Sequence, residues 1–151
     1  GESYWDGGYA GNPALFPLYE PELPEDILVV SINPIHRDQI PDSPLEIQNR
    51  INEISFNSSL LGELRAIDFV RRLIAEGRME RGRMKDVRVH MISDDTLMND
   101  LSASTKLTPS PQLIQRLKAA GQAAADAYLQ KEACKIGQEP GLNIRDILSH
   151  D

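Results

Sequence analysis

Two runs of apolar residues, separated by a long helical pattern, predict a strand–helix–strand unit. The run Ile27–Ile32 (ILVVSI) is continuous, rich in β-branched residues and followed by Asn33-Pro34, which is typical of a strand covered on both faces. The segment Val87–Ile92 alternates apolar and polar residues before it turns apolar, and this predicts a second strand. Because a helix separates them, we expect a parallel pair joined by a right-handed crossover.

The segment between the strands begins with a strong helix start signal. Ser43, Pro44 and Glu46 stand at the positions of a capping box with proline in the first turn, and Gly77 provides the stop. Apolar residues at spacings of three, four and seven predict one buried face, consisting of Ile47, Ile51, Ile54, Leu61, Leu64, Ile67, Val70 and Ile74. The weaker segment 57–62 leaves two alternatives open, one bent helix or two successive helices.

A second helix and a tail complete the predicted chain. Ser110-Pro111 caps a helix whose apolar stripe consists of Leu113, Leu117, Ala120, Ala124 and Tyr128. The tail from Gly137 is loop-like, with one docking turn at Ile144, Ile147 and Leu148. Two strands are too few for a sheet buried on both faces, so we expect an incomplete fold. We divide the chain into the later portion of a domain, residues 1–136, and a tail, residues 137–151.

Composition excludes several classes of protein. With 23 acidic and 16 basic residues the chain carries a formal charge of −7, which disfavours nucleic acid as a partner. No apolar run approaches the ~18 to 20 residues that cross a bilayer. One cysteine and three scattered histidines point to neither an internal disulfide nor a structural zinc site. Basic residues gather between Arg65 and Arg88; we interpret them as a solvated helix end and loop, with a contact to an anion or a transient contact to a membrane surface as the alternative.

Two sequence blocks carry a family resemblance. The first is Tyr4–Leu18 (YWDGGYAGNPALFPL), and the second runs from Leu101 through Ser104-Thr105-Lys106 and continues over the helix to Leu129. The first block resembles the Asp-Gly-Gly block of bacterial patatin-like phospholipases, and the second resembles the C-terminal ending of that family. The two blocks occur in the same order as in the family. The resemblance covers nearly the whole chain. It implies a partial three-layer α/β fold, with parallel strands flanked by helices.

The resemblance also implies a chemistry. Members of this family cleave acyl esters of lipids with a Ser-Asp dyad and need neither metal nor nucleotide cofactor. Asp6 matches the dyad aspartate, and Gly7 and Gly8 match the glycines that shape its loop. Neither the G-x-S-x-G elbow of the nucleophile nor a glycine-rich oxyanion loop occurs in this sequence. We therefore expect a missing N-terminal segment of the same protein to supply them, and this chain to be inactive alone.

The resemblance leaves partners and origin open. The expected substrate is a lipid or another acyl ester, and the expected location is cytoplasmic or peripheral to a bacterial membrane, with secretion as an open alternative. Uncovered strand edge and helix face predict association with the missing segment, a homo-oligomer or poor solubility. The alternatives are a non-enzymatic interaction module derived from the same family, and a proteolytic product.

The chemistry of Asp6 depends on its surroundings. In a dyad the carboxylate takes the serine proton directly, and partial burial makes a carboxylate a stronger base. We expect Tyr4, Trp5 and Tyr9 to form apolar walls around it; the competing interpretation is an ordinary Asp-Gly turn. Helix capping and a solvated turn explain Asp94, Asp95 and Asp100, near His90, better than a cation site does. We assign no chemistry to the remaining candidates His36, Ser104, Thr105, Lys106, Cys134 and His150.

Overall fold

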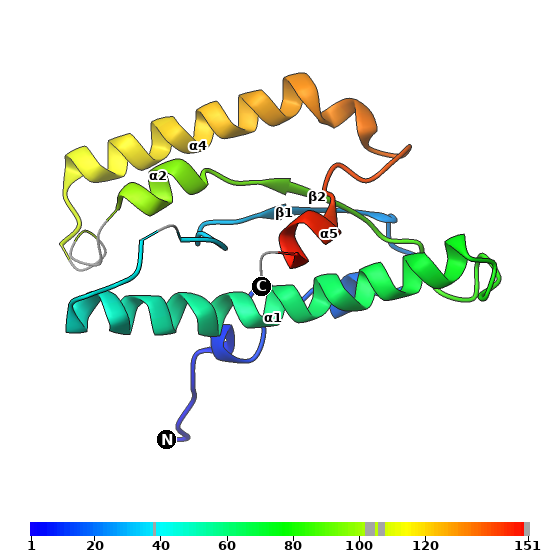
Figure 1. Ribbon diagram of the computed structural model, residues 1–151, viewed down its shortest axis with the longest axis horizontal. Helices are drawn as coiled ribbons and strands as arrows, with labels where there is room; N and C mark the ends of the chain where they lie inside the picture. Colours follow the sequence, from blue (N-terminus) through cyan, green and yellow to red (C-terminus); the bar gives the residue numbers. More distant parts are fainter. Residues whose placement is uncertain (38, 102–104, 106–107, 150–151) are drawn as a thin grey trace.

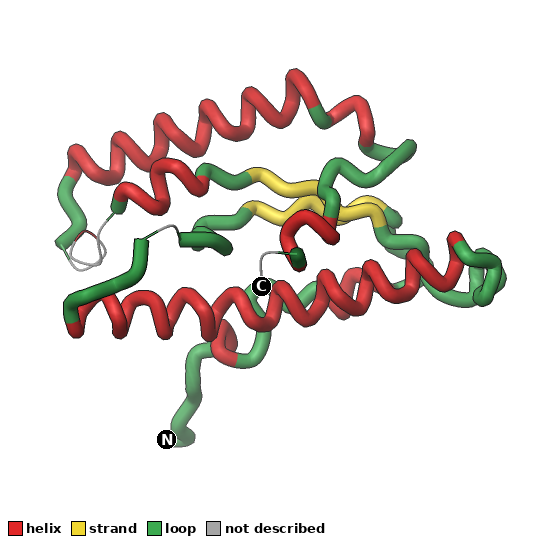
Figure 2. The backbone as a smooth tube through the Cα atoms, in the orientation of Figure 1, coloured by secondary structure: helices red, strands yellow, loops and turns green. Residues whose placement is uncertain are grey.

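Two parallel strands lie between two long helices in the computed structural model, which describes residues 1–37, 39–101, 105 and 108–149. β1 (Asp26–Val30) pairs with β2 (Arg88–Ile92), with Asp26 opposite Arg88. In Figure 1, α1 (Pro44–Ala75) lies on one side of the strands and α4 (Pro111–Lys131) on the other. The shorter elements are η1 (Gly7–Tyr9), η2 (Phe16–Tyr19), α2 (Asp95–Asp100), η3 (Ala133–Lys135) and α5 (Ile144–Leu148). The chain is therefore α/β, and the predicted strand–helix–strand order is confirmed (Figure 2).

The capping box at the start of α1 forms as predicted. The Glu46 backbone N–H donates to the Ser43 hydroxyl at 3.3 Å, and the Glu46 carboxylate accepts from the Ser43 backbone N–H at 3.4 Å. Of the two alternatives for the segment that follows, the structure has one uninterrupted helix. It ends at Ala75, ahead of Gly77, whose φ of 69° lies in the left-handed region that glycine tolerates without a steric penalty.

The core lies between α1 and the strands. Leu64 and Val89 are completely buried, and Leu60, Ile67 and Ile27 pack around them. Other members of this core are Leu15, Val29, Val87 and Ile144. Because Leu60, Leu64 and Ile67 are three and four residues apart, they share the face of α1 that meets the sheet.

The predicted buried face of α1 is wrong in its first half. Ile47, Ile51 and Ile54 are 44–54% exposed, while Glu53 and Asn57 turn toward the sheet. The physical reason is that these two polar side chains hold the β1–α1 loop. Glu53 binds Arg37, and the Asn57 Nδ2 donates to a backbone carbonyl of that loop at 2.8 Å. The three isoleucines lie a quarter to nearly half a turn around the helix from that face and form a second apolar stripe in solvent.

The C-terminal segment packs against the strands and α1. The Gly137 N–H donates to the Asp26 carboxylate at 3.0 Å, and the Leu142 N–H donates to the Val89 carbonyl at 2.9 Å. The expected docking turn is the short helix α5, and Ile144 is buried in the core. None of the described helices combines the length and the apolar character that crossing a bilayer requires.

Candidate functional site

The Asp6 loop forms a single turn of 3₁₀ helix. Asp6 caps this turn, because its Oδ1 accepts a hydrogen bond from the Gly8 backbone N–H at 2.7 Å. A Cβ atom at Gly8 would lie 2.7 Å from Cε1 of Phe56 on α1, so only glycine allows the loop to approach the helix this closely. A Cβ atom at Gly7 would meet nothing within 4 Å. We expected both glycines to shape the loop, but among the described residues only the packing of Gly8 against Phe56 requires a glycine.

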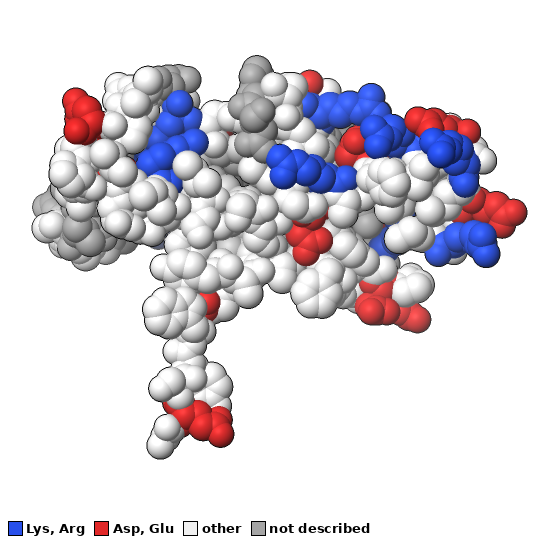
Figure 3. Space-filling model, turned by 60° about the horizontal axis from the view of Figure 1, so that its bottom comes forward, with Lys and Arg blue, Asp and Glu red and all other residues white. Residues whose placement is uncertain are grey.

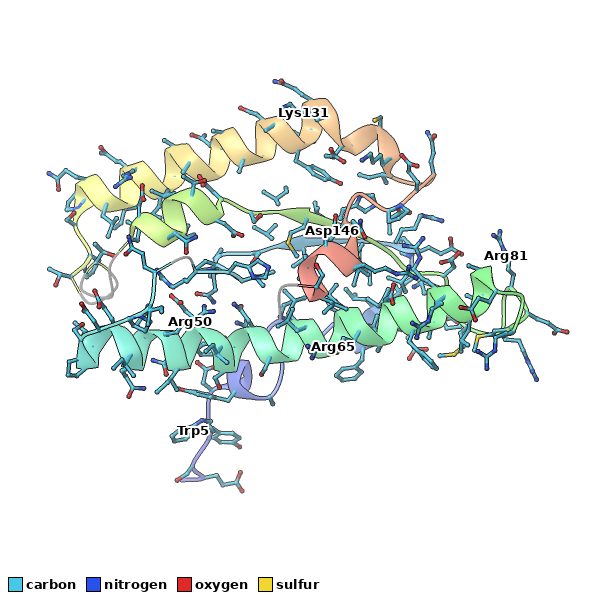
Figure 4. All side chains as sticks on the ribbon, viewed as in Figure 1. Trp5, Arg50, Arg65, Arg81, Lys131 and Asp146 are labelled. Carbon is cyan, nitrogen blue, oxygen red and sulfur yellow. The ribbon has the colours of Figure 1, made fainter. Side chains whose placement is uncertain are left out.

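The expected burial of Asp6 is wrong for this chain. Asp6 is exposed, and the side chains proposed as its walls are exposed as well, Tyr4 by 86% and Trp5 by 82%. In Figure 4, Trp5 lies on a segment that leaves the far side of α1 from the strands. The physical reason is that no helix or strand among the described residues covers the segment that contains Tyr4, Trp5 and Asp6. The second carboxylate oxygen of Asp6 has no hydrogen-bond partner among the described residues.

Aromatic contacts connect the Asp6 loop to the interior of the molecule. The Trp5 and Tyr9 ring centroids lie 5.8 Å apart, and the Tyr9 and Phe56 centroids lie 5.2 Å apart. Phe56 also lines a cavity, and Asn12, further along the same loop, lines it too. Asp6 is not among the lining residues. The carboxylate therefore does not face this cavity, and its loop reaches the lining only through Asn12 and through the contact of Tyr9 with Phe56.

The cavity lies at the carboxyl ends of the two strands, between α1, α2 and α4, and has a volume of about 790 Å³. Ligands of α/β proteins bind preferentially at this end of a parallel sheet. Val30 and Ile32 reach into it and are 63% and 70% exposed. The other apolar lining residues are Ile92, Met98, Leu101 and Leu117, with Ala120, Gly121, Ala124 and Ala125 of α4. The small residues of α4 leave the space open.

The polar part of the cavity lining consists mainly of uncharged side chains. These residues are Asn12, Ser31, Asn33, Asn49, Asn52 and Ser93, and none of the lysines and arginines that the structure describes lines the cavity. Two acidic residues also line it, and both have partners. Asp94 caps α2 by accepting a hydrogen bond from the Leu97 N–H at 2.9 Å. Glu53, which is 1% exposed, is bound by Arg37.

The pair of Arg37 and Glu53 closes one side of the cavity. The Arg37 Nε and Nη2 atoms each donate to a different Glu53 oxygen at 2.7 Å, and Asn49 donates a third hydrogen bond at 2.8 Å. Hydrogen bonding to Glu53 raises the pKa of Arg37 above its ordinary value. A two-pronged guanidinium–carboxylate contact is strong and directional. It fixes the β1–α1 loop on α1.

A second polar cluster, which the sequence did not reveal, lies at the other end of the strands. The Asp26 carboxylate accepts hydrogen bonds from Arg88 Nε at 3.1 Å and Nη2 at 2.7 Å, from the Gly137 N–H, and lies 2.9 Å from His90 Nε2. The hydrogen bonds from Arg88 hold the pKa of the Asp26 carboxyl well below its ordinary value. His90 is 1% exposed and packs edge-to-face against Tyr128. The cluster joins β1, β2 and the C-terminal segment.

The structure separates the residues of the weaker cation-site alternative. Asp94 is a helix cap, Asp100 lies 3.9 Å from Arg116, and His90 is bound to Asp26 instead. Among the described residues, His, Cys, Asp and Glu side chains form no group of three or more that could hold a metal ion. The capping interpretation is therefore confirmed for Asp94.

Part of the basic segment has a structural role. Arg71 pairs with Asp86 at 3.1 Å, and the Lys85 ammonium group donates to the Leu18 and Glu20 carbonyls at 2.7 and 2.8 Å. Arg81, at the loop end of α1 in Figure 4, is exposed. Figure 3 shows acidic side chains interspersed with the basic ones on this end of the molecule. This arrangement favours a solvated helix end, and the contact with a membrane stays a prediction.

The remaining candidates do not gather into a site. Cys134 is exposed and free, and His36 is half-buried. Ser104, Lys106 and His150 lie outside the described residues. Comparisons of the chain with protein-family models, curated proteins and solved structures found no match.

Proposed function

We propose that this chain is the later portion of a patatin-like lipid acyl hydrolase and that Asp6 is its general base. The observation that carries the proposal is the placement of the Asp6 loop beside an apolar cavity at the carboxyl ends of parallel strands. The resemblance of the block Tyr4–Leu18 to the family's Asp-Gly-Gly block supports the role of Asp6. The nucleophilic serine and the oxyanion donors come from polypeptide outside these 151 residues.

The local geometry supports a carboxylate that works on a neighbouring hydroxyl. The bond from the Gly8 N–H fixes Oδ1 of Asp6, while the second oxygen faces outward and is accessible. In the complete site this oxygen takes the proton from the serine hydroxyl while the serine oxygen attacks the ester carbonyl carbon. The proton then passes to the departing alcohol, and water cleaves the acyl-enzyme by the same route in a second cycle. Backbone N–H donors stabilise the oxyanion of each step.

The exposed surfaces support association with the missing segment. Strands of parallel sheets are normally covered on both faces. Leu28 and Val30 of β1, and Ile32 just after it, are instead 46–70% exposed. A covering segment also shields Asp6 and the aromatic residues around it, which strengthens the carboxylate as a base. The same surfaces, together with the exposed stripe Ile47, Ile51 and Ile54, support the second candidate function, a non-enzymatic interaction module.

Ester hydrolysis by the protein encoded by the full reading frame tests the proposal. We expect Asp6→Asn to lower kcat for p-nitrophenyl ester hydrolysis by at least about 100-fold, the scale of general-base catalysis, without unfolding the protein. Asp126→Asn is the matched control, because Asp126 is exposed on α4, and its activity should stay unchanged. The 151-residue chain alone should be inactive. Full activity of the Asp6→Asn protein, or a reading frame without an upstream G-x-S-x-G, refutes the enzyme and favours the interaction module.

A further inference from the structure

Another pocket, which the proposed function does not use, lies between the C-terminal half of α1 and the segment that follows α4. Its volume is about 410 Å³, within the range of about 300–1,000 Å³ that is common for small-molecule sites. Among the described residues, it has no lining residue in common with the cavity at the carboxyl ends of the strands. It lies toward their amino ends, because the segment between Lys135 and Pro140, two of its lining residues, binds Asp26 through the Gly137 N–H.

Basic side chains from three separate elements converge on this pocket, which we call the basic pocket. These side chains belong to Arg71 and Arg72 of α1, Lys135 of η3 and Arg145 of α5. Asp68 is the one acidic residue that the structure places in the lining. The rest of the lining is uncharged and consists of Ala75 and the segment 140–144. In a chain with a formal charge of −7, four cations around one hollow create a local positive field that attracts anions.

Two of the arginines are held in place by contacts that leave most of their donors available. Arg71 binds Asp86 at 3.1 Å and Arg145 binds Asp68 at 3.4 Å, in each case through Nε alone. Within the described part of the chain, the Nη atoms of these two arginines donate no hydrogen bond. A guanidinium has five N–H donors, and its free edge matches two oxygens of a phosphate or a carboxylate. The pairs with Asp86 and Asp68 therefore orient the arginines without using up their capacity to bind an anion.

The other two cations of the basic pocket differ in their partners. The Cζ atom of Arg72 lies 5.7 Å from the centroid of the Phe69 ring, and Arg72 forms no ion pair with any residue that the structure describes. Lys135 lies 2.6 Å from a Glu132 oxygen, and hydrogen bonding to Glu132 raises the pKa of Lys135 above its ordinary value. Both side chains are therefore charged at neutral pH, and the guanidinium of Arg72 is the least neutralised charge at the pocket.

We infer that the basic pocket binds the phosphate group of a phosphate monoester. Such a group carries a charge of about −1.5 to −2 at neutral pH and has three acceptor oxygens. It can therefore engage the free donors of Arg71, Arg72 and Arg145 together, whereas a carboxylate has one charge and two oxygens. The carrier of the phosphate is either a small soluble molecule or a lipid head group at a membrane surface. This inference goes beyond the proposed function, because the pocket and the Asp6 loop belong to different parts of the molecule.

Binding measurements on the protein encoded by the full reading frame test the inference and identify the carrier. Isothermal titration calorimetry compares glycerol 3-phosphate with glycerol, and co-sedimentation compares vesicles of phosphatidylcholine with equimolar vesicles of phosphatidylcholine and an ether-linked phosphatidic acid. Binding of glycerol 3-phosphate but not of glycerol supports a soluble carrier. Binding to the phosphatidic acid vesicles without binding of glycerol 3-phosphate supports a lipid head group. No binding of glycerol 3-phosphate, together with equal sedimentation by both kinds of vesicle, overturns the inference.

Variants of single arginines locate the site. Arg72→Gln removes a cation that has no ion pair in the described part of the chain, so it should keep the fold and weaken phosphate binding at least about tenfold. Arg145→Gln, at a side chain that is 68% exposed, should have a similar effect. Arg78→Gln is the matched control, because it removes the same charge from the same end of α1 outside the lining, and should change the affinity less than about twofold.

The outcome of this comparison is decisive once circular dichroism shows that each variant is folded. Equal losses in Arg72→Gln and Arg78→Gln mean that a diffuse field attracts the phosphate, and they refute the site. Native affinity in both Arg72→Gln and Arg145→Gln refutes it as well. The probes that define the site contain no carboxylic ester, so none of these results depends on hydrolysis by the protein.

Discussion

Replacement of Asp26 by Asn tests how the chain holds its two strands and its C-terminal segment together. Asp26 lies at the start of β1, and its carboxylate accepts two hydrogen bonds from Arg88 and one from Gly137, and lies 2.9 Å from His90 Nε2. Its side chain is 15% exposed and that of Arg88 is 18% exposed. The substitution keeps the shape but removes the charge, and it turns one acceptor atom into a donor that faces other donors.

The size of the effect follows from this geometry. Breaking a fully buried ion pair costs about 3–5 kcal/mol, and the partial exposure of Asp26 and Arg88 lowers the cost. We therefore expect Asp26→Asn to lower the free energy of unfolding by about 2 kcal/mol at neutral pH. Glu25→Gln is the matched control, since Glu25 pairs with the same arginine at 2.7 Å but is 49% exposed. An exposed pair contributes below about 1 kcal/mol, so the control should change little.

The effect also depends on pH with a definite sign. The pKa of Asp26 is lower in the folded chain than in the unfolded chain, where it is about 3.9. The carboxylate therefore contributes stability that is fully present above about pH 5 and is lost as the pH falls through the folded pKa. Urea unfolding between about pH 2 and 7 should show a flatter acid limb for Asp26→Asn than for the native chain. Equal losses in the two variants, or parallel pH profiles of Asp26→Asn and the native chain, refute this account.

Two further substitutions test the surroundings of the candidate site. Gly8→Ala places a Cβ atom 2.7 Å from Cε1 of Phe56 and should lower the free energy of unfolding in urea by about 1–2 kcal/mol. The Cβ atom of Gly7→Ala meets nothing within 4 Å, so this variant should lose less than about 0.5 kcal/mol. Similar losses in the two variants would contradict the packing of the loop on α1. Glu53→Gln should cost about 3 kcal/mol, because it leaves the Arg37 guanidinium without its buried carboxylate, and the exposed Glu80→Gln serves as its control. A loss below about 1 kcal/mol for Glu53→Gln would show that the pair does not hold the β1–α1 loop.

Local signals in the sequence predicted most of the secondary structure. The capping box of Ser43 and Glu46 located the start of α1, and Ser110 located the start of α4. The continuous β-branched run from Ile27 to Ile32 predicted β1, and the alternation of apolar and polar residues from Val87 to Ile92 predicted β2. Gly77, with its positive φ, marked the helix end.

The sequence did not predict the features that depend on tertiary structure. The spacing of Ile47, Ile51 and Ile54 fits a buried face, but the polar anchors Glu53 and Asn57 decide which side of α1 meets the sheet. The local sequence does not predict the burial of these two residues, because their hydrogen-bond partners lie in the β1–α1 loop. The pairing of Asp26 with Arg88 likewise follows from the register of two strands 62 residues apart. The sequence pointed to Asp6 through a family resemblance, and that signal contains no information on burial.

Covalent labelling with a fluorophosphonate, followed by mass spectrometry of the labelled peptide, tests the central claim most directly. We expect the protein encoded by the full reading frame to be labelled on one serine upstream of Asp6, the labelling rate to fall at least about 100-fold in Asp6→Asn, and Asp126→Asn to react normally. Labelling at the native rate in Asp6→Asn, or no labelled serine in the full-length protein, would contradict a Ser-Asp dyad built on Asp6.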